Sequence, residues 1–186
     1  PEEINRKIVD HLSDINLPLS EHARGYLINE GLPPEQIIKI GTCMNEVLKY
    51  YMPKIEESKI LSDLKLQKRE YFLVSLHREE NVDYVENLRS IVKALDLLAS
   101  QFNKKVLVST HPRTKKRMES LNLKSENKLV EYLKPFGFLD YNKLQKYAYC
   151  VVSDSGTITE ESCLLEVPAI TIRNALRTML QGQSVI

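Results

Sequence analysis

Hydrophobic positions from residue 71 onward follow two alternating patterns. Short apolar runs at 71–76, 105–109, 128–133, 149–153 and 168–172 are typical of buried strands. The segment after the first run instead has apolar residues at three- and four-residue steps, which indicates an amphipathic helix: Val85, Leu88, Ile91, Val92, Leu95, Leu98 and Phe102. Shorter helices are predicted at 113–120, at 141–147 and after Gly156. Apolar strands separated by helices indicate a parallel sheet covered on both faces, so we predict an α/β, Rossmann-like domain over 71–173.

The first 70 residues have a weaker pattern. Helices are predicted near 2–12, 20–29 and 44–52, with a short strand at 37–41. Gly31 is expected to end the second helix, because the two prolines that follow at 33 and 34 cannot continue it. Residues 53–70 are charged and begin with Pro53, which predicts a solvated helical connector between two lobes.

Composition and charge exclude several classes of protein. The 186 residues are 42% hydrophobic and 27% charged, which suits one globular domain or parts of two. The net charge of +1 comes from mixed signs, so neither a nucleic-acid partner nor a membrane-surface partner is indicated. No apolar run approaches the ~18 residues of a membrane span. The three cysteines lack metal-ligand spacing, and we expect them to be reduced in a cytoplasmic protein.

Polar or glycine-bearing loops follow the predicted strands. They are 77–81 ("HREEN"), 110–113 ("THPR"), 135–138 ("PFGF"), 154–157 ("DSGT") and Arg173. Ligands of open α/β sheets bind outside the carboxyl ends of the strands. We therefore predict that these loops share one ligand-binding rim.

The turn at 155–157 has the chemistry of an anion site. The amides at the start of a helix and the positive end of its dipole attract phosphate, and Gly156 allows close approach to the backbone. Thr157 and Glu160 also fit a capping box, which is a structural alternative for Glu160. Glu161, one turn further, could accept hydrogen bonds from ribose hydroxyls. The chain lacks G-x-G-x-x-G and G-K-[ST], which argues against an NAD site and a Walker-type NTPase.

His77 is the best candidate for acid–base or phosphate chemistry, because it is the first residue beyond a buried strand and an imidazole titrates near neutral pH. The alternative is a rim histidine bonded to a backbone carbonyl. Arg78 could pair with phosphate or with Glu79 or Glu80. His111 has a similar but weaker case.

Seven segments carry a family resemblance. In order they read "PEEINR", "SEHAR", "IIKIGTCMNEVL", "VSLHREENV", "VSTHPRTKKR", "PFGFLDYNKL" and "SDSGTITEES", and they span residue 1 to about 173. Together they resemble the non-hydrolysing UDP-N-acetylglucosamine 2-epimerase family. The last three resemble most the branch that includes UDP-2-acetamido-2,6-dideoxy-L-talose and diacetamido-sugar 2-epimerases, which serve surface polysaccharides such as capsule or O-antigen.

The resemblance implies a fold, a reaction and a substrate. It implies two Rossmann-like lobes in the GT-B arrangement, with the site between them, a homodimer, and neither a redox cofactor nor a metal. The substrate is UDP-N-acetylglucosamine or a related UDP-acetamido sugar. The reaction eliminates UDP to leave a glycal and re-adds UDP after a proton returns to C2 on the other face, which needs an acid, a base and donors for the diphosphate.

The resemblance also implies residue roles by motif position. Glu2 matches a catalytic carboxylate and His77 a substrate-contacting histidine. The diphosphate loop of the family is matched by Ser155, Gly156 and Thr157, and its ribose-binding carboxylate by Glu161. Tyr141 matches an aromatic residue near the uracil. Arg78 and His111 match residues that hold a second, regulatory nucleotide sugar.

Two departures from the family pattern predict a fragment. First, the rest of the first lobe would precede Pro1. Second, the family has a His-Glu-Arg-Pro-Glu-Gly motif soon after the position of Arg173, and this sequence differs there, with Thr178 near the position of the motif's arginine. We therefore assign 1–52 as a remnant of the first lobe carrying the Pro-Glu-Glu helix, 53–70 as the connector, and 71–186 as a C-terminally incomplete nucleotide-sugar-binding lobe. A GT-B glycosyltransferase and an inactive nucleotide-binding remnant remain the alternatives.

Overall fold

A computed structural model describes residues 2–172, without the side chains of Glu2, Glu79 and Glu80. The described chain forms two compact units that divide between residues 46 and 47. None of the helices in this described part is both long and apolar enough to cross a bilayer.

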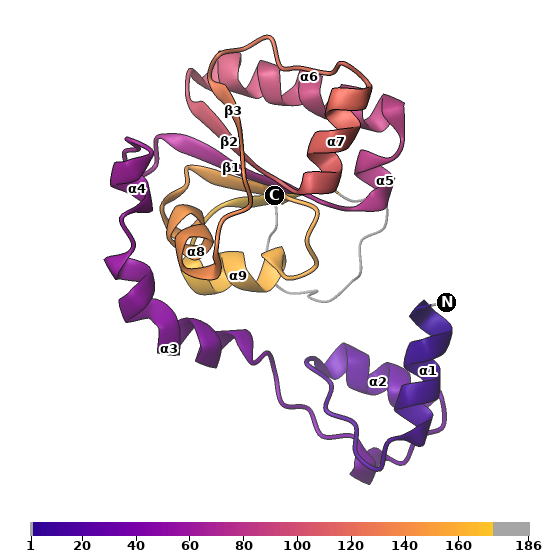
Figure 1. Ribbon diagram of the computed structural model, residues 1–186. Coiled ribbons are helices and arrows are strands. Elements are labelled where there is room, and N and C mark those ends of the chain that lie inside the picture. The colour runs from indigo at the N-terminus through magenta and orange to yellow at the C-terminus, as the bar shows by residue number, and fades with distance from the viewer. Residues whose placement is uncertain (1, 173–186) are drawn as a thin grey trace. The chain divides into compact units, whose positions relative to one another are not determined.

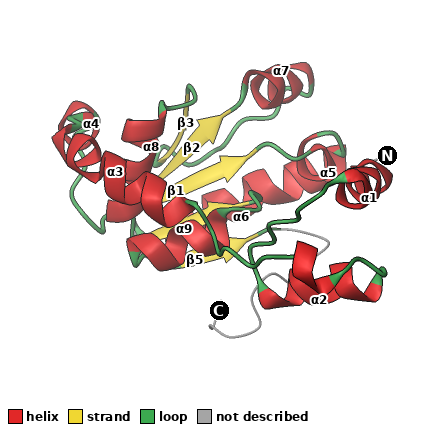
Figure 2. Cartoon of the chain, turned by 90° about the horizontal axis from the view of Figure 1, so that it is seen from below, coloured by secondary structure: helices red, strands yellow, loops and turns green. Residues whose placement is uncertain are grey.

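The second unit contains a five-stranded, wholly parallel sheet in the order β3-β2-β1-β4-β5. Its strands are β1 (Tyr71–Leu76), β2 (Lys105–Thr110), β3 (Val130–Leu133), β4 (Cys150–Ser153) and β5 (Ala169–Thr171). All five predicted strands are present, with ends that differ from the prediction by up to two residues. Figure 2 shows the strands running in one direction, so their carboxyl ends share one edge of the sheet.

Helices cover both faces of this sheet. The second unit holds α4 (Ile60–Asp63), α5 (Glu79–Val82), α6 (Val85–Phe102), α7 (Pro112–Ser120), α8 (Phe138–Tyr147) and α9 (Ile158–Leu165), and most of α3 (Met44–Glu57). In Figure 1, α6 and α7 lie on one face, and α8 and α9 lie on the other. The predicted α/β, Rossmann-like class is therefore confirmed.

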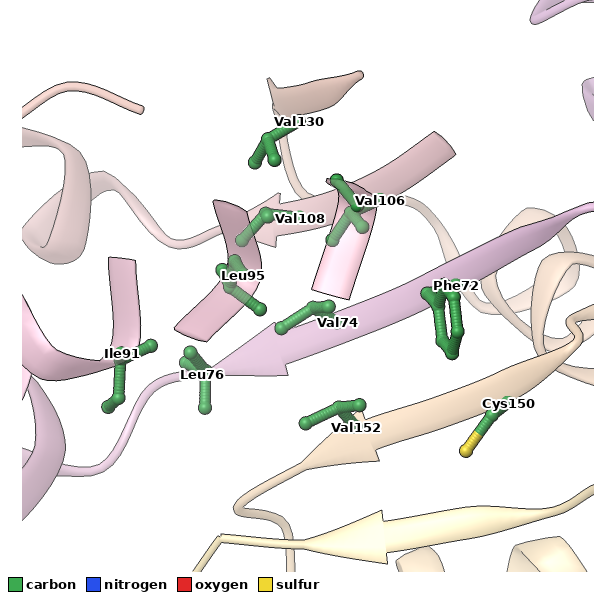
Figure 3. Packing of buried hydrophobic residues seen from close by; sticks show 11 residues of the cluster. Phe72, Val74, Leu76, Ile91, Leu95, Val106, Val108, Val130, Cys150 and Val152 are labelled. Carbon is green, nitrogen blue, oxygen red and sulfur yellow. The ribbon is translucent and has the colours of Figure 1, made fainter. Parts of the chain in front are cut away.

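The main core lies between α6 and one face of the sheet. Alternate residues of β1 point to this face, because side chains alternate along a strand. Figure 3 shows Val74 of β1 between Val106 of β2 and Val152 of β4, with Leu95 of α6 beside Val74. Every one of these side chains is less than a tenth exposed. The helical stripe and the strand runs of the sequence thus meet in one hydrophobic layer.

The other residues of β1 face α8 and α9. Tyr71 is completely buried there, and its hydroxyl donates to the carbonyl oxygen of Leu144 at 2.7 Å. The same alternation turns Ser75 toward this face, next to Tyr141 of α8. This layer underlies the carboxyl edge of the sheet where the candidate site lies.

The first unit consists of short helices. They are α1 (Glu2–Leu12), α2 (Glu21–Asn29) and the 3₁₀ turn η1 (Pro34–Gln36). Gly31 has a φ of +93°, so it ends α2 in a conformation that favours glycine, as predicted. The predicted strand at 37–41 is wrong: within the described residues it forms one isolated bridge, between Asn16 and Ile37. A lone bridge has no neighbouring strand to extend the ladder.

The connecting segment is more firmly attached than a solvated linker. Helix α3, predicted over 44–52, continues through Pro53 to Glu57. Its Ile55 is completely buried. The Glu56 carboxylate accepts hydrogen bonds from Lys143 and Lys146 of α8, both at 2.6 Å. The end of α3 is therefore fastened to the sheet domain.

Candidate functional site

The order of the strands creates a topological switch point at the carboxyl edge of the sheet. The chain passes from β1 outward through β2 to β3, and then returns to add β4 on the opposite side of β1. The loops after β1 and β4 therefore leave in opposite directions from adjacent strands. Open α/β sheets bind ligands at such a switch point. His77 follows β1 and 154–157 follows β4, so both predicted motifs flank this switch point.

A buried carboxylate joins the two loops. Asp154, wholly buried, accepts hydrogen bonds from the backbone amides of His77 (3.1 Å) and Arg78 (3.0 Å). The side-chain amide of Asn81 donates to the same oxygen, Oδ2, at 3.0 Å. The Asp154 amide in turn donates to the carbonyl of Ser75 at 3.3 Å. These bonds hold the start of the β1 loop against the end of β4.

The imidazole of His77 is bonded to this carboxylate. Nδ1 of His77 lies 3.0 Å from Oδ1 of Asp154, while half of the His77 side chain is exposed. The alternative of a rim histidine bonded to a backbone carbonyl is therefore wrong, because the partner is a carboxylate. With Nδ1 engaged, Nε2 is the ring nitrogen that a ligand can reach.

Arg78 is held beside His77. Its Nε donates to the backbone oxygen of Asp154 at 2.8 Å. This bond ties the guanidinium to the end of β4. A guanidinium is the side-chain group best suited to bidentate binding of an anion such as phosphate.

The turn at 155–157 is organised by its own hydroxyls. Ser155 Oγ lies 3.0 Å from Thr157 Oγ1 and accepts from the Thr157 amide at 3.4 Å. The predicted capping box is wrong: in the described structure Thr157 makes no side-chain cap bond to α9, because its helical φ and ψ of −86° and −11° differ from the extended cap geometry. Gly156 and Thr157 are exposed. The first turn of α9 therefore presents its amides at the rim without a side-chain cap.

The Glu161 carboxylate is held by the side-chain amide of a buried residue. Gln145 of α8 is wholly buried, and its Nε2 donates to Glu161 Oε2 at 3.0 Å. Its Oε1 is buried without a hydrogen-bond partner in the described part of the chain. The pair fixes one oxygen of Glu161, whose side chain is half-buried.

Tyr141 belongs to the same cluster. Burial raises its pKa to about 12, the carboxylates of Glu161 and Asp154 add to the rise, and a hydrogen bond with the Ser75 side chain opposes it. These influences place the Tyr141 hydroxyl beside Ser75 and near both carboxylates. The phenol is neutral at physiological pH and can take part only as a neutral group.

His111 occupies a different position on the rim. It precedes α7 as its N-cap residue, and its Nδ1 accepts from the Arg113 amide at 3.3 Å. The imidazole is exposed. Because β2 lies on the side of β1 away from β4, His111 follows the strand next to that of His77 and is not part of the Asp154 cluster.

Three predicted positions fall outside what the structure describes. Glu2 begins α1 in the first unit, but its side chain is not among the described ones. Arg173 and Thr178 lie beyond the described range. The structure therefore brings together His77, Arg78, Tyr141, the 155–157 turn and Glu161, and it does not test Glu2.

Two residues of the cluster do not stand out in the sequence. The sequence analysis includes Asp154 only as the first residue of the loop at 154–157. An acidic residue directly after a buried strand is nevertheless a signal that its carboxylate will be hydrogen-bonded. Gln145 gives no signal, because it lies between lysines on a helix with a polar sequence.

Two surface hollows lie elsewhere. One of about 1030 Å³ lies between α6 and the 121–128 loop, and one of about 850 Å³ lies between α7 and β3. Neither hollow is lined by Asp154, His77 or the 155–157 turn. We assign the site by the geometry at the switch point rather than by the size of these hollows.

Comparison with known proteins agrees with the geometry. A family model described as UDP-N-acetylglucosamine 2-epimerase matches residues 1–186. The UDP-N-acetylglucosamine 2-epimerase of Methanocaldococcus jannaschii is 35% identical over 180 residues, which are 94% of this chain and 49% of that protein. A UDP-2,3-diacetamido-2,3-dideoxy-D-glucuronate 2-epimerase of Pseudomonas aeruginosa is 33% identical over 178 residues, with shares of 94% and 48%.

Solved structures show the same similarity. That of UDP-N-acetylglucosamine 2-epimerase from Rickettsia bellii is 47% identical with a TM-score of 0.80, covering 94% of this chain and 46% of that one. The M. jannaschii enzyme in complex with UDP-GlcNAc and UDP is 35% identical with a TM-score of 0.83, covering 94% and 49%. The chain spans about half the length of the relatives it matches. Since the family model matches the whole chain, this protein belongs to the UDP-N-acetylglucosamine 2-epimerase family.

Proposed function

We propose that this chain is the C-terminal, nucleotide-sugar-binding part of a UDP-N-acetylhexosamine 2-epimerase. The observation that carries the proposal is the switch-point cluster, in which a half-exposed His77 is bonded to a buried Asp154 next to the helix start at 155–157. In the reaction a base removes the C2 proton, the C1–O bond breaks, and its electron pair leaves with UDP. Re-addition of UDP at C1 and return of a proton to the other face of C2 complete the inversion.

The 155–157 turn would bind the diphosphate. The amides of the first turn of α9 carry partial positive charge, and the hydroxyls of Ser155 and Thr157 add donors. The same donors stabilise the negative charge that develops on UDP as the C1–O bond breaks. His77, through Nε2, would contact the diphosphate or a sugar hydroxyl.

Glu161 would bind the ribose. A carboxylate held by the Gln145 amide can accept two hydrogen bonds from the vicinal hydroxyls of a ribose. Tyr141 lies near enough to Glu161 to sense its charge, which supports a position beside the uracil.

Other parts of the proposal depend on the whole protein. Glu2 would supply a catalytic carboxylate from the first lobe of a GT-B arrangement, and residues 53–70 would connect the lobes. Arg78 and His111 would hold a second nucleotide sugar. A cytoplasmic homodimer that makes capsule or O-antigen precursors is the expected context, and the similarity to a diacetamido-sugar epimerase favours an acetamido-sugar substrate.

Titration of this chain with UDP in a calorimeter tests the binding half of the proposal. We expect binding, and we expect the double substitution Ser155→Ala with Thr157→Ala to weaken it about tenfold, since hydrogen bonds to charged groups are worth about 1.5–3 kcal/mol each. Ser162→Ala is the matched control, because its hydroxyl bonds to Thr159 within the same helix. A folded chain without measurable UDP affinity contradicts the proposal.

The reaction is tested in a longer protein that contains this chain. Incubation with UDP-N-acetylglucosamine in D2O should place deuterium at C2, and transfer of labelled sugar to an acceptor should be absent. The opposite pattern would instead identify a GT-B glycosyltransferase.

A further inference from the structure

Asp154 does more than join two loops. Resting on the proposed function, we propose that Asp154 is a positioning residue: it holds the His77 imidazole with Nδ1 protonated and presents Nε2 to the bound nucleotide sugar. The sequence motif alone does not distinguish this role from that of a structural carboxylate. The contacts of the two Asp154 oxygens distinguish the two roles.

The two carboxylate oxygens of Asp154 share one donor and differ in the others. The His77 amide lies 3.2 Å from Oδ1 and 3.1 Å from Oδ2. Oδ2 also accepts from the Arg78 amide and the Asn81 side chain, both at 3.0 Å, whereas Oδ1 lies 3.0 Å from Nδ1 of His77. These donors hold the carboxylate in one orientation, in which Oδ1 faces the imidazole as an acceptor.

This arrangement determines the state of the imidazole. A carboxylate oxygen can only accept, so Nδ1 must carry the hydrogen. In the neutral ring Nε2 then has the free lone pair, and in the charged ring it has a second N–H. In both states Nε2, the nitrogen opposite Asp154, can form a hydrogen bond with a ligand. A buried carboxylate serves His in this way in the Ser-His-Asp arrangement of serine proteases, where it fixes the tautomer and stays ionised.

Burial accounts for the number of donors around Asp154. Asp154 is wholly buried, and a buried carboxylate is costly unless its oxygens are hydrogen-bonded. Of its donors, the amides of His77, Arg78 and Asn81 keep their protons at any pH compatible with folding. The imidazole is the partner of Asp154 that can exist in two tautomers. Asp154 thus couples a fixed framework to a group suited to acid–base work.

Nitrogen NMR of the imidazole rings tests the proposal directly. The chain has four histidines, at positions 11, 22, 77 and 111, so the His77 signals are assigned by their loss in His77→Gln. In the unsubstituted chain at alkaline pH we expect the Nδ1–H tautomer at His77. The Nε2–H tautomer there overturns the proposal, whatever any variant does.

Asp154→Asn adds a second arm. The Arg78 amide and the Asn81 side chain donate to Oδ2 alone, so the oxygen of the new amide should take that position and its nitrogen should face Nδ1. We then expect the ring to change to the Nε2–H tautomer. Asn81→Ser is the matched control, because it removes a donor from the same carboxylate but leaves the acceptor facing His77. We expect it to lower thermal stability and keep the Nδ1–H tautomer. A folded Asp154→Asn chain that keeps Nδ1–H contradicts the proposal.

UDP titration separates this proposal from the function on which it rests. We expect Asp154→Asn to weaken UDP binding about tenfold or more, because Nε2 no longer meets the ligand in the correct state. If the tautomer changes but the unsubstituted chain does not bind UDP, the positioning role stands and the proposed function fails. If UDP binds and the tautomer and affinity are insensitive to Asp154→Asn, the function stands and the positioning role fails.

Discussion

The side-chain amide of Gln145 donates to the carboxylate of Glu161 at 3.0 Å from a completely buried position. The bond joins α8 to α9. It gives the half-buried acidic side chain of Glu161 one preferred orientation, and this orientation has measurable consequences.

Gln145→Met should reduce discrimination between UDP and 2′-deoxy-UDP. The substitution keeps the volume but removes the donor, so Glu161 is free to turn away from the ribose. We expect the parent chain to prefer UDP about tenfold, and the ratio of the two dissociation constants to approach one in the variant. Gln101→Met, at an exposed position of α6, is the control, and calorimetry measures both ratios. An unchanged preference in the folded variant excludes this role for Gln145.

Tyr141 should act through its ring rather than its hydroxyl. Tyr141→Phe removes the bond to Ser75 and should lower the free energy of unfolding by about 1 kcal/mol, with little change in UDP affinity. Tyr141→Ala should weaken UDP binding by about 1–3 kcal/mol if the ring stacks on the base. Equal losses in the two variants would show that the ring does not stack.

Glu56 should make stability depend on pH in acid. Burial acts to raise the pKa of Glu56, but hydrogen bonds from Lys143, Lys146 and Tyr147 outweigh it and lower the pKa from 4.5 to about 2. The folded-state pKa is depressed, so the stabilisation is present above 4.5 and is lost as the pH falls from about 4.5 to about 2. The carboxylate is 36% exposed, so solvent screening limits the effect to about 1 kcal/mol.

Urea denaturation at several pH values measures this effect. Glu56→Gln should flatten the dependence between pH 4.5 and the lowest accessible pH. The neighbouring and exposed Glu57 provides the control, since Glu57→Gln should leave the pH profile as it is. A profile that is equally steep in all three proteins would show that the α3–α8 contact is not ionic in solution.

Leu95 should be a major contributor to the core. It is 4% exposed and packs on β1 and its neighbours (Figure 3), so Leu95→Ala should lower the free energy of unfolding by about 2–5 kcal/mol. Leu97, two residues further along α6, is 67% exposed, and Leu97→Ala should cost less than about 0.5 kcal/mol. Denaturant unfolding compares the two. Similar losses would contradict the placement of α6 on the sheet.

The sheet was predictable from the sequence because its central strands are buried on both faces, and a short run as continuously apolar as 71–76 is typical of such a strand. The same reasoning failed at 37–41. Ile38 and Ile40 are about half exposed, at 49% and 55%, because the described structure supplies no neighbouring strand to cover them. An apolar pattern predicts a strand only where a partner exists, and local sequence does not report the partner.

The site was predictable in its parts but not in its connections. The positions of His77 and Glu161 follow from strand and helix ends. The contact between His77 and Asp154 joins residues 77 positions apart, and it depends on β4 lying next to β1, which no local pattern encodes. The capping box failed for a local reason, since Thr157 has helical φ and ψ rather than the extended geometry of an N-cap residue.

The attachment of the β1 loop to β4 has a thermodynamic consequence. Since backbone amides at 77 and 78 are already bonded to Asp154, this edge is preorganised, and an incoming ligand need not supply the conformational entropy of ordering it. The free energy gained on contact is then available to distinguish one ligand from another. We therefore expect an edge of this kind to recognise the proposed nucleotide by complementarity rather than by reshaping itself on contact.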